Sequence, residues 1–303
     1  MPESYPSYDR LVQVRQLEYL VALAREQHFG RAADVCHVTQ STLSEAISRL
    51  EQELGVTLVE RGHHFNGLTA EGIRVLASAR AILAAHEALD SDLALLRGNL
   101  VGRLRIGVVP SAIAMVPVLL ERFSRENPLV DIDVRTDLTA RGIQSQLTDY
   151  ELDAGISYLD DLPPQFHARE LYREEFFVVT DSSTVDGQWA TTGFPWEQLA
   201  ELPLVLLSRR NRARRFLDAA LATESVVVQP AVETSSVALL FLYLARGRWS
   251  SIVSRSAIEG FRLPPGKVAV PLHLPGTLSV GLVTSTKRPG SLIVQHLEAT
   301  LDE

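Results

Sequence analysis

The sequence predicts a multidomain α/β protein with a helical N-terminal domain, a long connecting helix and a C-terminal domain of two α/β lobes. Apolar residues follow helical spacing in the N-terminal part. Residues 70–97 then carry a sustained seven-residue apolar repeat. From residue 103 onward, short apolar runs alternate with helical segments. A chain of 303 residues with 46% hydrophobic and 22% charged residues is long enough for two or three folded domains.

Residues 29–61 predict two helices joined by a tight break at His37-Val38. The second helix is expected to begin at Thr39, a suitable N-cap, and to stop at Gly55, a residue that tolerates a left-handed backbone. Steeply crossing helices need small residues where they meet, and Ala32-Ala33 supply them. The apolar residues of the second helix lie on one face, since their spacing is four, three and four: Leu43, Ile47, Leu50 and Leu54. This is the helix-turn-helix pattern.

The second helix of such a motif inserts its N-terminal residues into the DNA major groove. The residues at that position here are short and polar, and glutamine, serine and threonine all contact bases or phosphates. The alternative is an ordinary helical hairpin, because each feature is common by itself. The candidate DNA contacts on this helix are Thr39, Gln40, Ser41, Thr42, Ser44 and Glu45, and Arg31 and Arg49 are candidates for phosphate contact.

Residues 56–69 predict a small two-stranded wing beside the second helix. Apolar residues flank a turn that lies between Gly62 and Gly67. Arg61, His63 and His64 lie near the tip and are candidates for phosphate or minor-groove contact. Adjacent histidines without a third ligand nearby indicate a solvated loop rather than a metal site.

The net charge of −8 argues mildly against DNA binding. Residues 1–98 hold nine Arg, no Lys and thirteen Asp or Glu, a balance of −4, whereas a typical DNA-binding domain is basic. Phosphate contact depends on where the arginines lie rather than on the sum, so modest non-specific affinity is expected. We find no apolar run of about 18 residues and no secretory start. No membrane association is therefore expected, and the expected location is the cytoplasm.

Thr69 is expected to cap a long helix from residue 70 to residue 97. Its apolar positions alternate steps of four and three, a heptad seam with one polar member. A helix lying on its own domain is the alternative, but pairing with a second subunit explains the seam better and would place two recognition helices on two half-sites. The seam residues are Val75, Ala79, Ile82, His86, Leu89, Leu93 and Leu96.

The C-terminal part predicts two similar α/β halves with a cleft between them. Residues 98–102 are a linker, and strands are expected at 103–110, 131–135, 152–158 and 174–180, with a repeat of the theme from residue 203. The resulting domains are residues 1–69, a linker and dimerisation segment at 70–102, and residues 103–303. Within the last, one lobe spans about 103–180 and 277–303, and the other about 181–276.

Four turns at the carboxyl ends of these strands offer hydroxyls and backbone N–H groups, which favour an anion. The alternative at each turn is plain helix capping. The candidate ligand-binding residues are Pro110, Ser111, Thr136, Thr139, Ser208, Arg209, Arg210, Thr234 and Ser235. The expected ligand is a small anion such as a carboxylate.

We find no nucleophile motif, phosphate loop, paired-histidine metal motif or dinucleotide fingerprint. No catalytic residue, metal site or cofactor is therefore expected, and an enzyme is the third interpretation. The single cysteine, Cys36, rules out an intramolecular disulfide and is typical of a small core residue.

Residues 15–72 resemble the LysR-type transcriptional regulators. The matching residues include Leu17, Phe29, Ala32-Ala33, Gln40, Leu43-Ser44, Leu54-Gly55, Leu68-Thr69 and Gly72. The rest of the chain is similar to the same family's layout of linker helix and two lobes. The resemblance implies a winged helix-turn-helix, a homodimer or homotetramer, and an effector domain like the periplasmic (type 2) solute-binding proteins. It also implies that a small effector in the cleft modulates binding to double-stranded DNA, and contact with RNA polymerase if the protein activates transcription.

The chain departs from the family pattern at several positions. Ser41 stands where the family often has proline, and residues 246–249 replace a glycine-rich, apolar turn. Residues 28–44 look similar to the DNA-reading segment of peroxide-sensing members, yet the effector domain has no cysteine for a thiol–disulfide switch. The second interpretation is a solute-binding module whose helical N-terminus serves oligomerisation without binding DNA.

Overall fold

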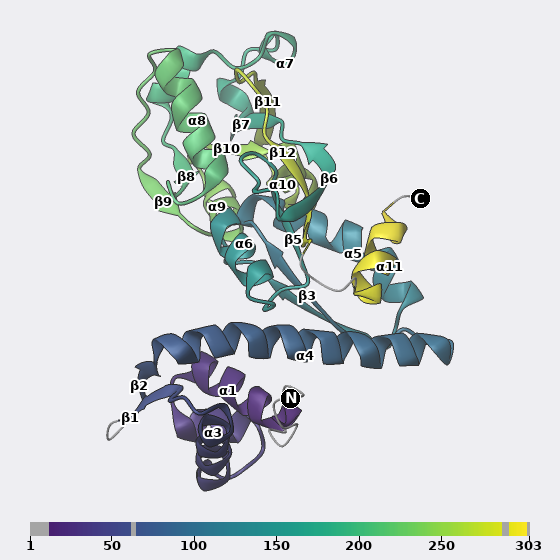
Figure 1. Cartoon of the computed structure of the whole chain (residues 1–303). Coiled ribbons are helices and arrows are strands. Elements are labelled where there is room, and N and C mark those ends of the chain that lie inside the picture. The colour runs from purple at the N-terminus through teal and green to yellow at the C-terminus, as the bar shows by residue number, and fades with distance from the viewer. Residues whose placement is uncertain (1–11, 62–64, 287–290, 302–303) are drawn as a thin grey trace, which may run out of the picture. The chain divides into compact units, whose positions relative to one another are not determined.

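The computed structural model describes residues 12–61, 65–286 and 291–301, and it divides into two compact units. The first unit comprises the chain up to Arg97, and the second comprises most of the chain from Gly98 onward. Each unit has its own hydrophobic core and is described by itself (Figure 1).

The first unit contains the predicted winged helix-turn-helix. Its elements in order are α1 (Val14–Glu26), α2 (Phe29–Val35), α3 (Gln40–Leu54), β1 (Val59–Arg61), β2 (Phe65–Leu68) and α4 (Ala70–Leu96). The strands β1 and β2 pair antiparallel and form the wing.

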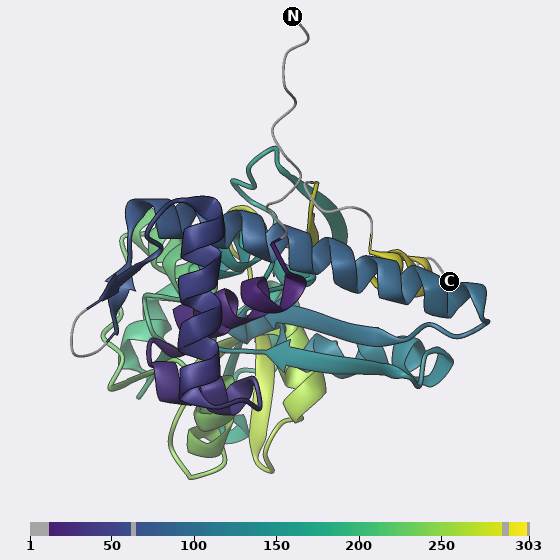
Figure 2. The ribbon, with the colours of Figure 1, turned by 60° about the horizontal axis from the view of Figure 1, so that its bottom comes forward.

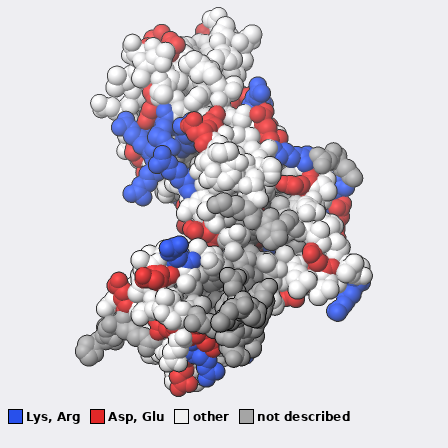
Figure 3. All heavy atoms as spheres, in the orientation of Figure 1, with Lys and Arg blue, Asp and Glu red and all other residues white. Residues whose placement is uncertain are grey.

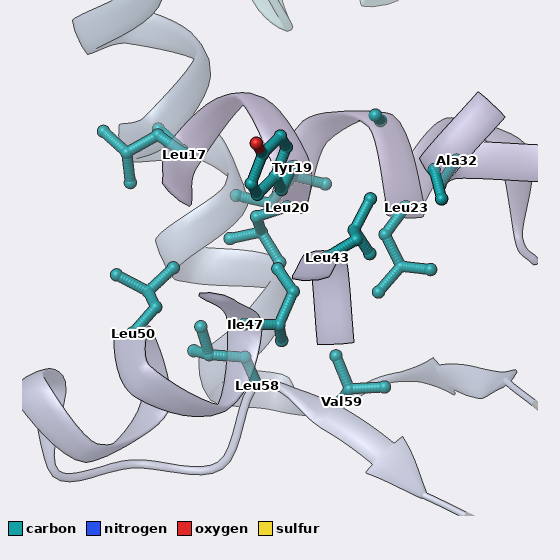
Figure 4. Packing of buried hydrophobic residues seen from close by; sticks show 14 residues of the cluster. Leu17, Tyr19, Leu20, Leu23, Ala32, Leu43, Ile47, Leu50, Leu58 and Val59 are labelled. Atoms are coloured by element: carbon teal, nitrogen blue, oxygen red, sulfur yellow. The ribbon is translucent and has the colours of Figure 1, made fainter. Parts of the chain in front are cut away.

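The helices of this unit pack around one core (Figure 4). Leu43, Ile47 and Leu50 of α3 are fully buried against α1. Ala32 and Ala33 are also buried, as expected where α2 crosses its neighbours. The Thr39 hydroxyl caps α3, and Gly55 ends it with φ 72°. Local signals in the sequence therefore set both ends of α3.

The long helix α4 packs along only part of its length. Ala79 is buried and Val75 is half-buried, both within the core of the first unit. Figures 1 and 2 show α4 running on past the α1–α3 bundle. The later seam residues lie exposed in the single chain: Ile82, His86, Leu89, Leu93 and Leu96.

The first lobe of the second unit is built on a five-stranded sheet with the order β4-β3-β5-β12-β6. Strand β3 runs parallel to β4 and β5, whereas β12 runs antiparallel to β5 and β6. Its elements are β3 (Gly102–Val108), η1 (Pro110–Met115), α5 (Val116–Glu126), β4 (Val130–Arg135), α6 (Ala140–Thr148), β5 (Ala154–Tyr158), β6 (Phe166–Arg173), β12 (Ser279–Ser285) and α11 (Leu292–Thr300).

The second lobe has an antiparallel sheet, β10-β7-β11, and a separate parallel pair, β8-β9. Its strands and longer helices are β7 (Phe176–Asp181), β8 (Val205–Leu207), α8 (Arg212–Thr223), β9 (Val232–Thr234), α9 (Val237–Leu244), β10 (Ser251–Ser254), α10 (Arg255–Phe261) and β11 (Lys267–Leu272). Its short helical turns are η2 (Ser182–Thr184), α7 (Trp189–Thr192) and η3 (Trp196–Glu201).

One predicted strand belongs to the other lobe. Residues 174–180 were expected to complete the first lobe, but β7 pairs with β10 and β11 of the second. The chain thus crosses between lobes at about residues 174–175 and returns at 273–278, where the Glu174 N–H donates to the Leu278 carbonyl over 2.8 Å. The strand β6, which the sequence pattern does not indicate, fills the edge of the first sheet instead.

Candidate nucleic-acid interface and ligand pocket

The N-terminal turn of α3 presents polar side chains to solvent. Gln40, Ser41 and Thr42 are exposed, and Ser44 is half-buried. The Thr39 hydroxyl oxygen accepts the Thr42 N–H over 3.2 Å. Thr39 therefore shapes the turn, and its hydroxyl also lies within hydrogen-bond distance of the Ser41 and Thr42 hydroxyls, at 2.9 and 2.8 Å.

The outward face of α3 continues with Glu45 and Arg49, both exposed and opposite the buried Leu43 and Ile47. Among the described residues, Arg49 has no ion-pair partner, so its charge is free for a phosphate or a base. Glu45 adds a negative charge on the same face, where a carboxylate can accept a hydrogen bond only from a base amino group such as that of cytosine.

The remaining candidates of the first unit lie off α3. Arg31 is exposed and donates to the Glu26 carbonyl over 2.5 Å, and its guanidinium lies 3.9 Å from the Glu26 carboxylate. Arg61 is the last residue of β1. His63 and His64 lie outside the described residues.

The second unit contains a pocket of about 770 Å³ between its two lobes. This volume lies within the range of small-molecule sites. Both lobes contribute to its wall, through the turns that follow β3, β4, β8 and β9. Five of the residues predicted from sequence line it: Pro110, Thr139, Ser208, Arg210 and Ser235.

The structure does not bring the other predicted residues into this wall. The exposed Arg209 pairs with Asp218 over 3.1 Å, and Thr136 is exposed outside the lining. Thr234 is buried, where its hydroxyl accepts the Ser236 N–H. Ser111 is buried and hydrogen-bonded to the Tyr158 hydroxyl, and it lines a separate, mainly apolar cavity of about 30 Å³.

Sequence reasoning missed several pocket residues, chiefly three arginines. Arg141 follows Thr139 at the start of α6, and Arg212 and Arg215 lie on the first turn of α8. Asn211 and the buried Tyr158 also contribute. The signal was present, since residues 209–215 hold five arginines among seven residues. Only the fold separates those that face the pocket from Arg209 and from Arg214, which is buried against Asp218 and Glu233.

Within the described part of the chain, no group of three His, Cys, Asp or Glu side chains is arranged to hold a metal ion. No described helix combines the length and the apolar character that crossing a membrane requires.

Two family descriptions match this chain in the order of its two units. "Bacterial regulatory helix-turn-helix protein, lysR family" matches residues 14–73. "LysR substrate binding domain" matches residues 97–303. The second match alone covers more than half of the chain.

Curated relatives align over nearly the whole length. The "DNA-binding transcriptional dual regulator OxyR" of Escherichia coli K12 is 30% identical over 294 residues, which cover 95% of this chain and 93% of that protein. A "probable hydrogen peroxide-inducible genes activator" of Streptomyces viridosporus is 29% identical over 301 residues, covering 97% and 95%. These relatives are regulators of transcription rather than enzymes, and they favour the DNA-binding interpretation over a solute-binding module.

Solved structures give the same result. A full-length OxyR variant from Pseudomonas aeruginosa superimposes with a TM-score of 0.73 at 27% identity, covering 95% of this chain and 94% of that one. The fold also matches CbnR in complex with its target DNA, with a TM-score of 0.64 at 22% identity and coverage of 96% and 99%. The chain belongs to the LysR family of bacterial transcriptional regulators, with an N-terminal DNA-binding domain and a C-terminal effector-binding domain.

Proposed function

We propose that this regulator reads DNA with the N-terminal turn of α3, pairs with a second copy along α4, and responds to a small anion bound between the lobes of its second unit. The observation that carries the effector assignment is the pocket wall, in which arginines from both lobes face a space of about 770 Å³.

The DNA contacts rest on exposure and chemistry. Gln40, Ser41 and Thr42 are exposed on a helix whose opposite face is fully packed, so their backbone positions are fixed before DNA arrives. Gln40 can pair with adenine, and the hydroxyls of Ser41 and Thr42 can contact bases or phosphates. Arg49, further along the same helix, is suited to a phosphate, with Arg31 and Arg61 as further candidates.

The dimer contact rests on the exposed part of α4. Leu89, Leu93 and Leu96 are 54%, 46% and 85% exposed on one seam of the helix. Apolar side chains repeating at heptad spacing are typical of a helix that pairs with another helix. A dimer would present two α3 helices to two half-sites of a pseudo-palindrome.

The proposed effector is not peroxide sensed through a disulfide bond. Cys36 is the only cysteine in the chain, and it is the C-cap of α2 in the DNA-binding domain. Partial burial, together with the nearby Glu18 carboxylate, raises the pKa of its thiol, which lowers the fraction of reactive thiolate. An intramolecular thiol–disulfide switch would need a second cysteine, so a reversibly bound anion is the better effector.

The DNA contacts are tested with DNA selected from a random pool by the full-length protein. We expect Gln40→Ala to relax the preference at one base pair, since a bidentate glutamine–adenine contact discriminates by about 1–3 kcal/mol. Arg49→Ala should weaken binding to all sequences and lower the slope of log affinity against log salt by about one. Fluorescence anisotropy measures both.

Arg125→Ala is the matched control, because Arg125 is exposed on α5 of the second unit. If Gln40→Ala and Arg49→Ala select the same sites with the same affinities as the control, α3 is not the element that reads DNA.

A further inference from the structure

The pocket between the lobes concentrates positive charge in an acidic protein. Arg141, Arg210, Arg212 and Arg215 line it together with a single carboxylate, Asp137. Four guanidinium groups against one carboxylate leave an excess of three positive charges, although the whole chain carries −8. Figure 3 shows basic side chains gathered on the second unit beside α6 and α8. Such clustering creates a strong local field in a concave site.

Protein groups neutralise little of this charge. Among the described residues, Arg141 and Arg210 have no ion-pair partner. Arg212 lies 3.6 Å from Asp161, whose side chain is 89% exposed, and such a pair contributes little. Counting Asp161 still leaves an excess of two.

Arg215 organises the turn before α8 while keeping its charge. Its Nη1 donates to the backbone carbonyls of Arg209 and Arg210 over 3.2 and 2.8 Å. These contacts satisfy peptide oxygens and do not cancel the guanidinium charge. The 208–211 turn is therefore held in a shape that directs further positive charge to the pocket.

The charges come from both lobes. Arg141 follows Thr139 on the first turn of α6 in the first lobe, whereas the other three arginines surround the start of α8 in the second lobe. Like charges on two walls of one pocket repel each other in the absence of a ligand. An anion that reaches both walls removes this repulsion and adds charge-assisted hydrogen bonds on each side.

Building on the anionic effector proposed above, we infer that the pocket binds a small molecule with at least two negative charges, which bridges Arg141 of the first lobe and Arg210 of the second. A single carboxylate neutralises one guanidinium and leaves the walls repelling. Phosphate esters and polycarboxylates share the required chemistry. A phosphate group carries about two negative charges, a polycarboxylate carries one on each carboxylate, and both suit arginine forks.

Isothermal titration of the full-length protein, at constant ionic strength, tests this inference with four probes: pyrophosphate, citrate, inorganic phosphate and acetate. We expect pyrophosphate or citrate to bind saturably, with a dissociation constant at least tenfold lower than that of acetate. The stronger of the two identifies phosphate or carboxylate chemistry in the natural ligand. Equal binding of acetate would overturn the inference while leaving a monoanionic effector, and normal DNA binding, in place.

Arg141→Gln and Arg210→Gln locate the site. Each should weaken the multivalent anion at least tenfold, whereas Arg209→Gln, next in the chain but paired with Asp218 outside the pocket, should leave affinity unchanged. If only Arg210→Gln weakens binding, the bridge between lobes is wrong. If none of the three does, the anion binds elsewhere and the inference fails.

A ligand-free measurement separates this role from a structural one. Removing one of the repelling charges should leave the melting temperature of Arg141→Gln and Arg210→Gln equal to or above that of the native protein. A lower melting temperature in both variants would mean that these arginines stabilise the fold, and it would overturn the inference.

Discussion

Glu174 is a carboxyl group buried where the chain crosses from the first lobe to the second. Its side chain is 5% exposed, and neither carboxylate oxygen has a hydrogen-bond partner of good geometry among the described residues. Burial raises its pKa to about 8, and the Ser254 hydroxyl, which favours the charged form, offsets only part of this. Tyr158 and Tyr172 lie close enough that the Glu174 charge adds to the rise that burial gives their pKa values.

The raised pKa of Glu174 makes the stability of the fold depend on pH. Because the pKa is raised from about 4.5 in the unfolded chain to about 8 in the fold, the folded state holds a proton over this window that the unfolded state has lost. The contribution of this proton to the free energy of unfolding is therefore fully present below about pH 4.5. It falls as pH rises to about 8, by at most about 1.4 kcal/mol per pH unit.

The variant Glu174→Gln keeps the shape of the neutral side chain and should remove this slope. Thermal melting of both proteins between about pH 6 and about pH 8.5 measures the difference, since this range spans the upper part of the window. If the melting temperatures of both proteins change with pH in the same way across that range, Glu174 does not have a raised pKa.

At the scale of single elements, α3 shows what a sequence can predict. Its N-cap Thr39, its stop at Gly55 and its apolar spacing are all local, and the structure confirms helix, cap and stop within one residue of the expectation. The strand at 174–180 shows the limit. Its apolar pattern is local, but its partners, residues 251–254 and 267–272, lie far along the chain, so the pattern could not assign it to a lobe. The partly exposed, charged β6 has no clear alternation to indicate it.

The start of α4 depends on a glycine. A Cβ added at Gly72 would lie 2.1 Å from the Leu58 carbonyl oxygen, which belongs to the backbone and cannot rotate away. We expect Gly72→Ala to destabilise the winged domain by about 1–3 kcal/mol, since overpacking forces backbone shifts. Chemical denaturation measures this, with Gly187→Ala as the control, because nothing lies within 4 Å of its added Cβ. Equal stability of the two variants would contradict the packing described.

The exposed seam of α4 gives the prediction on assembly. A charge at Leu93, in the interface between two paired helices, would be buried without a partner. Leu93→Glu should therefore convert the dimer to a monomer. Light scattering after gel filtration measures the mass. Glu87→Gln, on the opposite side of the helix by its spacing, should leave the mass unchanged. A dimeric Leu93→Glu protein would place the dimer contact elsewhere.

At the scale of the whole molecule, the charge distribution separates two tasks. The DNA-binding part has a net charge of −4 over residues 1–98, so general attraction to DNA is weak, and specificity must come from a few well-placed side chains. In the second unit, four arginines line the pocket: Arg141, Arg210, Arg212 and Arg215. The sequence predicted an anion there and nominated both Arg209 and Arg210. Only Arg210 lines the pocket, because a run of arginines alone does not show which side chains face inward.

The central claim is that this protein recognises a particular DNA sequence. A gel-shift of the purified full-length protein against the intergenic DNA upstream of its own gene, at two salt concentrations and with excess competitor, tests it most directly. We predict a discrete, competitor-resistant complex at both salt concentrations. A smear that vanishes at the higher salt, or no shift even at the lower one, would contradict sequence-specific recognition of this DNA, because purely electrostatic binding is lost as salt rises.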